Sequence, residues 1–212
     1  MPSPTKTLIV IPTYNERENL TRLIETIHRV VEHVHILIVD DHSPDGTGEM
    51  AEALSEKDDR IFVLRRPGKL GLGTAYLDGF GWGLERDYTF FQQMDCDFSH
   101  APSDLPRFFS AMEDADLVLG SRYTAGGGTQ NWPLRRKIMS RGGSFYASTI
   151  LGLSIKDLTS GFKCFRREVL EAIPFEQVRS EGYAFQIEMT WRTFEAGFCV
   201  HEIPILFVDR SL

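Results

Sequence analysis

The sequence predicts an α/β fold: a Rossmann-like domain whose mainly parallel central sheet carries helices on both faces. Two observations lead to it. Strand-like and helix-like segments alternate through residues 1–120, and several strand-like segments end in polar side chains, as strands do at the ligand-binding edge of a parallel sheet. The composition agrees, since 212 residues of which 42% are hydrophobic and 25% charged are typical of one globular domain. Without internal repeats or a linker, residues 1–212 are expected to form a single domain.

Each element of the first 120 residues has its own signal. A short apolar run, residues 7–11, is stopped by Pro12 and predicts a buried strand. Apolar residues then recur every three or four positions from Leu20 to Val31, which predicts a helix with Asn15 as its N-cap and Glu18 completing a capping box. The same reasoning predicts strands at 34–39, 61–64, 88–94 and 116–119, and helices at 47–54, 74–84 and 104–112.

Residues 121–212 are less regular. They contain a glycine-rich loop at 126–128, a basic helix predicted over 134–151, a loop at 157–161, a helix predicted over 183–196 and a pair of strands within 199–208. We interpret this region as a C-terminal elaboration of the same domain.

Charge and cysteine content exclude several classes of function. Lys and Arg total 23 against 30 Asp and Glu, so the net charge of −7 makes nucleic-acid binding a poor expectation. No apolar run reaches the roughly 20 residues of a membrane-spanning helix, and the N-terminus has no signal-peptide pattern. Three cysteines, an odd number without metal-site spacing, indicate reduced thiols in a cytosolic protein.

Polar side chains follow four of the predicted strands. These groups are Pro12-Thr13-Tyr14-Asn15-Glu16, Asp40-Asp41, Asp95-Cys96-Asp97 and Gly120-Ser121-Arg122-Tyr123. Because the carboxyl ends of parallel strands meet at one edge of the sheet, we expect these groups to surround a single ligand site.

The pair Asp95 and Asp97 predicts a metal site. Residues two apart in an extended segment point the same way, so the two carboxylates can share one hard cation. A solvated turn would also explain two aspartates after a strand. Their position among the other strand ends favours Mg²⁺ or Mn²⁺ together with a phosphorylated substrate, because the carboxylates would otherwise repel a diphosphate.

Asp41 and a set of basic residues complete the predicted site. The Asp41 carboxylate can accept hydrogen bonds from a base or a ribose, and the segment from Asp40 to Asp45 is also expected to form an Asx turn that shapes the pocket. The basic residues are Arg122, Arg135, Arg136, Lys137, Arg141, Lys163 and Arg210. Such a cluster is often only a solvated face, but it also suits an anionic phosphate acceptor.

Other motifs fail on spacing. Gly71 and Gly73 are not followed by the third glycine of a dinucleotide-binding loop, and Lys69 is not followed by the Ser or Thr of a P-loop. There is no nucleophile elbow and no HExxH pattern, so hydrolase chemistry of those types is not indicated.

The assembled segments resemble inverting glycosyltransferases of family 2. Within that family, the chain is similar to the catalytic subunits of dolichyl-phosphate (polyprenyl-phosphate) mannose synthases. The segments that carry the resemblance are 12–19, 40–47, 69–75, 94–100, 120–123, 157–163, 182–188 and 207–210. The Pro-Thr-Tyr-Asn-Glu and Asp-x-Asp elements point only to family 2, and the later segments narrow the resemblance to the lipid-phosphate branch.

The resemblance implies a glycosyltransferase A-type fold in which residues 1–120 bind the nucleotide sugar and residues 121–212 bind the acceptor. GDP-mannose would be held by Pro12, Tyr14, Glu16, Val39, Asp41, Asp95, Cys96, Asp97, Arg122 and Arg210. The metal ligands would be Asp95 and Asp97, with Ser99 as a third. The acceptor phosphate would face Arg122, Arg135, Arg136 and Lys163, with residues 157–163 as part of a mobile acceptor loop. Asp97 and Arg122 are the implied catalytic residues.

The implied reaction is metal-assisted transfer of mannose from GDP-mannose to dolichyl or polyprenyl phosphate, which gives GDP and a β-D-mannosyl phosphate lipid. A phosphate monoester with a second pKa of about 6 is largely a dianion at neutral pH and needs no strong general base. The protein's work is then to position the phosphate and to stabilise the departing GDP.

The family pattern continues past Arg210 with a Gly-x-Ser-Lys segment, whereas this chain ends at Leu212, so we expect a truncated C-terminus. The enzyme would then reach its lipid in one of three ways: by peripheral contact with the cytoplasmic face of a membrane, through small membrane subunits as partners, or through a missing tail.

Three alternatives remain open from the sequence. The chain could transfer glucose or another hexose to polyprenyl phosphate, or it could be a sugar-phosphate nucleotidyltransferase, although Pro12-Thr13-Tyr14 is not the glycine-rich loop such an enzyme needs. It could also be a non-catalytic subunit that binds a nucleotide sugar, against which the intact Asp41, Asp95 and Asp97 argue.

Overall fold

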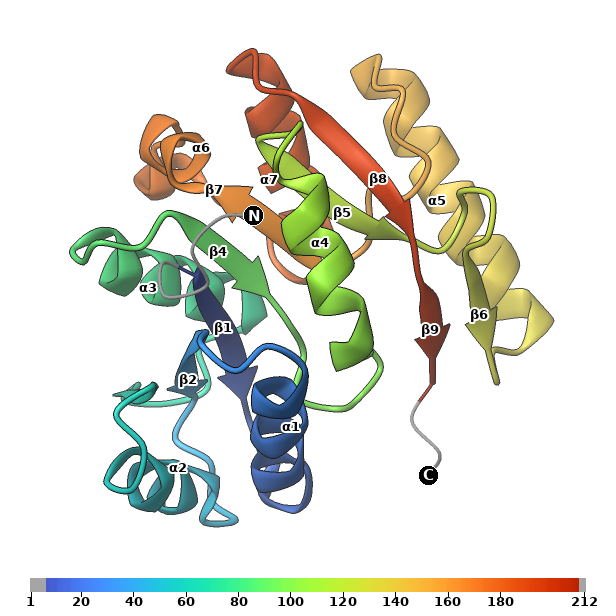
Figure 1. Cartoon of the computed structure of the whole chain (residues 1–212). Helices are drawn as coiled ribbons and strands as arrows, with labels where there is room; N and C mark the ends of the chain where they lie inside the picture. The colour runs from blue at the N-terminus through green and yellow to red at the C-terminus, as the bar shows by residue number, and fades with distance from the viewer. Residues whose placement is uncertain (1–6, 210–212) are drawn as a thin grey trace.

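A seven-stranded sheet forms the centre of the molecule, in a computed structural model that describes residues 7–209. Its strands, in spatial order, are β3 (Ile61–Arg65), β2 (His35–Asp40), β1 (Thr7–Thr13), β4 (Phe90–Gln93), β7 (Lys163–Arg166), β5 (Leu117–Ser121) and β8 (Val200–Pro204). Only β7 runs against the others, and every other pairing in this sheet is parallel. The predicted α/β fold with a mainly parallel sheet is therefore confirmed (Figure 1).

Helices cover both faces of the sheet, as predicted. One face packs on α1 (Arg17–Val30), α2 (Thr47–Ser55) and α4 (Leu105–Ala111), and the other on α3 (Leu72–Leu84), α6 (Arg167–Ala172) and α7 (Gly182–Glu195). Short 3₁₀ turns, η2 (Pro102–Asp104) and η3 (Phe175–Gln177), precede α4 and α7. The periodic apolar residues of α1 from Leu20 to Ile27 are buried between this helix and the first of these faces, as their spacing predicts.

The α5 helix (Leu134–Leu151) lies outside this sandwich, beside the β5–β8 end of the sheet (Figure 1). A second, two-stranded sheet of β6 (Gly128–Gln130) and β9 (Leu206–Val208) lies next to it. Both strands predicted within 199–208 are present, but they do not pair with each other: β8 bonds to β5 and β9 bonds to β6, with Ile205 between them.

The alternating glycines of α3 allow close packing against the sheet. A Cβ on Gly79 would lie 2.5 Å from Val10 Cγ1, and one on Gly83 would lie 2.4 Å from a ring carbon of Phe91. Residues four apart share one face of a helix, so these two glycines let the α3 backbone approach β1 and β4. Gly79 and Gly83 therefore serve the packing of α3 on the sheet.

The start of α1 differs from the predicted capping box. Asn15 does not cap the helix: its φ is +60°, the cap residue is Glu16, and no side chain within the helix start makes a capping hydrogen bond. The backbone N–H groups of this segment donate instead to the loop after β2. Asn15 donates to Ser43 Oγ, Glu16 to Thr47 Oγ1 and Arg17 to an Asp45 carboxylate oxygen. A neighbouring loop has replaced the local cap, which a local sequence pattern does not reveal.

The sequence reading also missed β7 and α6. The strand has four residues, Lys-Cys-Phe-Arg, too few and too polar for a strand signal, yet β7 lies between β4 and β5 and bonds antiparallel to both. Strands from both sides of residue 120 thus belong to one sheet, and the division into a donor-binding and an acceptor-binding half stays a prediction.

Candidate functional site

The ligand-binding edge of the sheet lies where the chain order reverses. Strand β1 has β2 on one side and β4 on the other, so the carboxyl ends of β1 and β4 border the switch point of the sheet. Three residues other than glycine have left-handed backbone conformations in the loops that follow: Asn15 after β1, His42 after β2 and Phe98 after β4, with φ of 60°, 58° and 61°. Such conformations are costly and concentrate where a loop is held for function.

A cavity of about 260 Å³, here called the β1–β4 cavity, opens at this edge. Most of the predicted nucleotide-sugar residues line it: Pro12, Tyr14, Glu16, Asp41, Asp95, Cys96 and Asp97. Of the others, Val39 is fully buried in the core and Arg122 lines a neighbouring cavity. Arg210 lies outside the described residues.

The Asp41 carboxylate holds the loop that closes one wall of this cavity. Arg66 Nη1 donates to Asp41 Oδ1 at 2.5 Å, and the backbone N–H groups of Leu70 and Gly71 donate to Oδ2 at 3.2 and 3.3 Å. The sequence reading missed Arg66. Its position directly after the strand beside β2 is the signal that could have found it, because parallel neighbours end at the same edge.

The expected Asx turn after β2 is present. Asp40 accepts hydrogen bonds from the backbone N–H and the hydroxyl of Ser43, and Asp45 accepts from the backbone N–H and hydroxyl of Thr47. Gly46, with φ of +87°, turns the chain into α2. Across the cavity mouth, the Lys69 ammonium lies 4.0 Å from the centre of the Tyr14 ring.

Asp95 and Asp97 line both the β1–β4 cavity and a second, central cavity of about 250 Å³. The Tyr76 hydroxyl donates to Asp95 Oδ1 at 3.1 Å, and the backbone N–H of Ser99 donates to Asp97 Oδ1 at 3.0 Å. Burial, and after it the charge of Asp95, raise the pKa of Tyr76 well above its usual range, so this hydroxyl keeps its proton.

These two carboxylates fit a divalent cation that is completed by a substrate. No cluster of three or more Asp, Glu, His or Cys side chains suited to a metal occurs within residues 7–209. Mg²⁺ is commonly held by one or two carboxylates plus substrate phosphates and waters, and the open cavity beside Asp95 and Asp97 leaves room for such oxygens. The Ser99 hydroxyl is buried without a hydrogen-bond partner, so its predicted role as a third ligand stays a prediction.

The central cavity contains further buried polar atoms without partners in the described structure. Besides Ser99 Oγ, these are Trp132 Nε1 and Gln186 Oε1, and all three residues line the cavity. A buried polar atom left unbonded costs about 1–3 kcal/mol. The cavity therefore suits an occupant rich in hydroxyl or phosphate oxygens. Trp132 and Gln186 were not among the predicted site residues.

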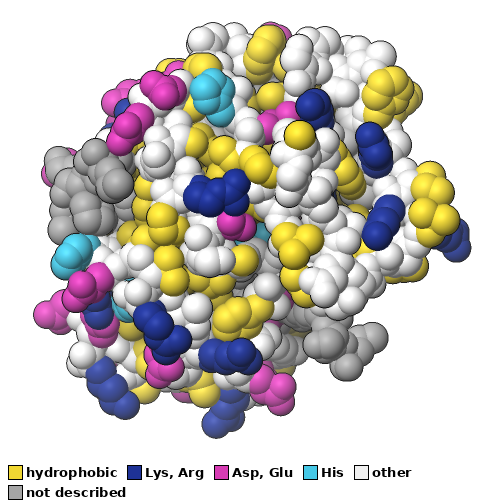
Figure 2. Space-filling model, turned by 45° about the vertical axis from the view of Figure 1, so that its right-hand side comes forward, with side chains coloured by type: hydrophobic (Ala, Val, Ile, Leu, Met, Phe, Trp, Pro, Cys, Tyr) yellow, Lys and Arg dark blue, Asp and Glu magenta, His cyan; other side chains and the backbone are white. Residues whose placement is uncertain are grey.

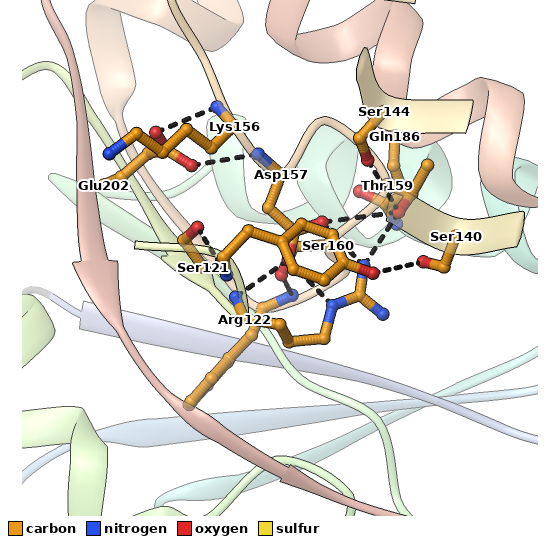
Figure 3. A network of polar contacts seen from close by, with 12 residues as sticks. Ser121, Arg122, Ser140, Ser144, Lys156, Asp157, Thr159, Ser160, Gln186 and Glu202 are labelled. Atoms are coloured by element: carbon orange, nitrogen blue, oxygen red, sulfur yellow. Dashed lines mark hydrogen bonds and ion pairs between the residues drawn. The ribbon is translucent and has the colours of Figure 1, made fainter. Parts of the chain in front are cut away.

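Arg122 forms a buried ion pair at the floor of this cavity (Figure 3). Its Nε and Nη2 donate to the two carboxylate oxygens of Asp157 at 2.7 and 2.6 Å, and its backbone N–H donates to Oδ2 at 2.8 Å. Nη2 also donates to Thr159 Oγ1. Burial acts to lower the pKa of Arg122, but the hydrogen bond and charge of Asp157 raise it above its ordinary value. The predicted phosphate ligand is thus tied to the loop that the resemblance assigns to the acceptor.

The remaining predicted acceptor residues lie in different environments. Arg136 lines the central cavity and donates to Asp209, while Arg135 lines a groove along α5. Lys163 is fully buried on β7, where its ammonium donates to the backbone oxygen of Gln186 at 2.6 Å. Burial lowers the pKa of Lys163 to about 7. The structure therefore does not bring Lys163 to the cavity surface with the arginines.

The groove along α5, here called the α5 groove, has a volume of about 570 Å³. Its lining residues are Trp132, Pro133, Arg135, Arg136, Met139, Ser140, Gly143, Thr159, Tyr183 and Ile187. Large apolar side chains on α5 are 62–72% exposed: Leu134, Ile138, Met139, Phe145, Tyr146 and Ile150. On the right of Figure 2, apolar and basic side chains are interspersed over the surface that α5 presents. No helix within residues 7–209 is both long and apolar enough to cross a membrane.

Solved structures share this fold. The glucosyl-3-phosphoglycerate synthase of Mycobacterium tuberculosis, in a crystal structure with Mn²⁺, UDP and glucosyl-3-phosphoglycerate, superposes with a TM-score of 0.70 at 19% identity, over 97% of this chain and 71% of that one. A crystal structure of the same enzyme with Mn²⁺ and UDP-glucose gives 0.70 at 20% identity. At this level of identity the likeness shows the glycosyltransferase A-like fold.

Two curated relatives are similar along nearly the whole chain. The polyprenol monophosphomannose synthase of Mycolicibacterium smegmatis is 50% identical over 209 residues, 98% of this chain and 79% of the relative. The undecaprenyl-phosphate mannosyltransferase of Micrococcus luteus is 45% identical over 207 residues, 98% of this chain and 85% of the relative. The glycosyl transferase family 2 model matches residues 8–173. The chain therefore belongs to glycosyltransferase family 2.

Proposed function

We propose that the chain transfers mannose from GDP-mannose to a polyprenyl phosphate and releases GDP. One observation carries the proposal: three cavities follow one another across the C-terminal edge of the sheet. The β1–β4 cavity and the central cavity share Leu72, Asp95 and Asp97, and the central cavity and the α5 groove share Trp132, Arg136, Thr159 and Tyr183. An end lined by Tyr14, Asp41 and Lys69, a pair of carboxylates in the middle and an apolar groove suit a nucleotide, a diphosphate and a lipid phosphate in that order.

The relatives support the sugar and the acceptor class. Both are named for mannose transfer to a polyprenyl-type phosphate, and both are similar over 98% of this chain. GDP-mannose is the donor that we propose, with the guanosine in the β1–β4 cavity beside Tyr14 and Asp41.

Asp95 and Asp97 would hold a Mg²⁺ or Mn²⁺ ion, which when bound neutralises the donor diphosphate and the departing GDP. The structures of the glucosyl-3-phosphoglycerate synthase solved with Mn²⁺ show the same fold with such an ion present. In this chain, Tyr76 and the Ser99 backbone hold the two carboxylates in place before any ligand arrives.

The acceptor phosphate belongs in the central cavity, between the carboxylates and the two arginines Arg122 and Arg136. As a dianion it can attack the anomeric carbon directly, so the protein needs to orient it and to offset its charge rather than to remove a proton. Attack from the side opposite to the departing GDP inverts the anomer and gives a β-linked mannosyl phosphate. His100, the histidine that lines this cavity, has its pKa lowered by burial and stays neutral, so it adds no charge to the site.

The lipid portion of the acceptor fits the α5 groove, and α5 itself suits the surface of a membrane. The helix carries Arg135, Arg136, Lys137 and Arg141 and no acidic residue. Basic and apolar side chains on one exposed helix bind an anionic lipid surface through charge and burial together. We propose a peripheral enzyme on the cytoplasmic face, to which the three free thiols Cys96, Cys164 and Cys199 are suited.

The test is a transfer assay with radiolabelled GDP-mannose, a polyprenyl phosphate and Mg²⁺ or Mn²⁺, followed by organic extraction. Label in the lipid phase that is lost on chelation of the metal is expected. Asp97→Asn should lose this metal-dependent transfer. The matched control is Asp59→Asn, changed at an exposed position remote from the site. Transfer from UDP-glucose in place of GDP-mannose would overturn the assigned donor. Binding of GDP-mannose without transfer would favour a non-catalytic subunit.

A further inference from the structure

Two side chains outside the predicted site hold Asp95 from opposite sides. Tyr76, on α3, reaches one carboxylate oxygen, and His100, in the loop after β4, lies against the other. We infer that Tyr76 and His100 are positioning residues that fix the Asp95 carboxylate for the bound divalent cation. This inference rests on the proposed metal-assisted function and concerns residues that act through Asp95.

The Tyr76 hydroxyl has little freedom. The side chain is fully buried, and its ring is stacked on Phe80 at 6.0 Å and on Phe185 at 6.2 Å, with 3° between the planes of Tyr76 and Phe185. The hydroxyl at the end of this fixed ring donates to Asp95 Oδ1 at 3.1 Å. A buried tyrosine stacked on two aromatic rings presents its hydroxyl at one position, so the carboxylate oxygen bonded to it is also restrained.

His100 restrains the same residue through its backbone. The backbone N–H of Asp95 donates to His100 Nδ1 at 3.1 Å, so Nδ1 is an acceptor and the ring proton is on Nε2. Nε2 lies 3.8 Å from Asp95 Oδ2, too far for a hydrogen bond but with its N–H dipole favouring the carboxylate. The ring is stacked on Phe162 at 4.7 Å and 6°, which sets its orientation.

The two contacts together determine where the Asp95 carboxylate points. Metal-ligating side chains are commonly oriented by such outer partners, and loss of one partner typically weakens metal affinity by about 10–100-fold. Without the Tyr76 hydroxyl, Asp95 would gain rotational freedom that binding of the cation must then remove. The effect should therefore be seen in metal affinity even when no transfer occurs.

The first experiment compares Tyr76→Phe with Tyr88→Phe. Both variants remove one buried tyrosine hydroxyl, but Tyr88 bonds to His35 Nδ1 at the opposite edge of the sheet. Mn²⁺ affinity is measured by titration of the protein with GDP present, and the unfolding midpoint is measured beside it. We expect Tyr76→Phe to weaken Mn²⁺ binding about 10-fold and Tyr88→Phe to leave it unchanged.

Variants of His100 separate its two contacts. His100→Phe keeps a ring against Phe162 and removes both nitrogens, whereas His100→Asn keeps an acceptor near the Asp95 N–H and removes the donor toward Oδ2. We expect the larger loss of Mn²⁺ affinity in His100→Phe and partial rescue in His100→Asn.

The outcomes distinguish this inference from the proposed function. Wild-type Mn²⁺ affinity in both Tyr76→Phe and His100→Phe would overturn the positioning role while leaving the metal site intact. Equal Mn²⁺ affinity in wild type and Asp97→Asn would overturn the metal site itself, and the positioning role with it.

Discussion

The two sides of the central cavity are built in opposite ways. On the β1–β4 side, the aspartates at the strand ends are held by fixed partners: Asp40 by Ser43, Asp41 by Arg66 and Asp95 by Tyr76. On the α5 side, a helix of 18 residues buries only one side chain, Ser144, and leaves large apolar groups exposed.

The contrast follows from what each side has to bind. A charged nucleotide sugar arrives from water, so groups that are already oriented avoid reorganisation when it binds. An apolar chain or a membrane surface supplies the missing contacts for α5, because exposed apolar area is stabilised only when something covers it. The following predictions test this division between a prearranged polar side and an apolar side completed from outside, from the largest expected effect to the smallest.

Asp97→Asn should strongly weaken metal-dependent binding of GDP-mannose, because loss of one of the two carboxylates weakens the hold on the cation that offsets the diphosphate charge. The check is calorimetric titration of the donor with and without Mn²⁺, with Asp59→Asn as the control. Metal-dependent binding of unchanged strength in Asp97→Asn would remove this residue from the prearranged side.

Arg122→Met should destabilise the protein by about 3–5 kcal/mol, because Asp157 would remain as a buried charge without its partner. Denaturant unfolding measures the loss. The double variant Arg122→Met with Asp157→Leu is expected to recover much of this stability but not the transfer activity. Full activity in the double variant would contradict the role of Arg122 at the acceptor phosphate.

Lys137→Gln combined with Arg141→Gln should weaken binding to vesicles that contain anionic lipid by about 30-fold, since each cation near such a surface contributes about 1 kcal/mol. Neither residue lines the α5 groove or the central cavity. Co-sedimentation with vesicles is the measurement, and Arg29→Gln with Lys57→Gln is the control pair at exposed positions on α1 and after α2. Equal losses in the two pairs would show that net charge alone, rather than α5, governs binding.

Gln186→Leu should raise the KM for the nucleotide sugar about 10-fold, because it removes one hydrogen bond between Gln186 Oε1 and a substrate hydroxyl. The exposed Gln177→Leu serves as its control. An unchanged KM, with an unchanged preference among hexose donors, would exclude Gln186 from sugar recognition.

The most gradual effect concerns pH. Lys163 has a pKa of about 7 in the folded protein against an ordinary value of 10.5, so the unfolded chain binds the extra proton between these two values. Stability should therefore rise as pH increases from 7 toward 10, by no more than about 1.4 kcal/mol per pH unit. Denaturant midpoints at several pH values test this, and Lys163→Met should give the flatter profile. A wild-type profile that falls over this range would contradict it.

Much of the fold could be read from the sequence because its signals are local. The buried runs of β1, β2 and β5 and the periodicity of α1 each depend on nearby residues alone. β7 could not be found this way, because its four residues are a strand only in contact with β4, some 70 positions earlier in the chain. The cap of α1 was misread for the same reason: Ser43 and Thr47, not Asn15, satisfy the backbone there.

For the site too, the sequence predicts what adjacent residues show and misses contacts between distant segments. Asp41, Asp95 and Asp97 were predicted together because parallel strands end together, and all three line the β1–β4 cavity. Arg66, directly after β3, bonds to Asp41, Tyr76 on α3 bonds to Asp95, and Gln186 on α7 lines the central cavity. No spacing in the sequence relates these three residues to Asp41 or Asp95. Val39, assigned by the resemblance alone, and Lys163, assigned as one of the basic residues, both have buried side chains.

The antiparallel β7 has a consequence for how the protein reaches its native state. Until residues 163–166 are in place, β4 and β5 have no neighbour on their facing sides, and Phe90, Phe91 and Leu117 lie on strands with an open edge. Closing the sheet requires a contact between segments far apart in the chain, and such contacts form slowly during folding. Until they form, the open strand edges can associate with other chains. A fragment cut at residue 120 should therefore aggregate rather than fold as a separate nucleotide-binding unit.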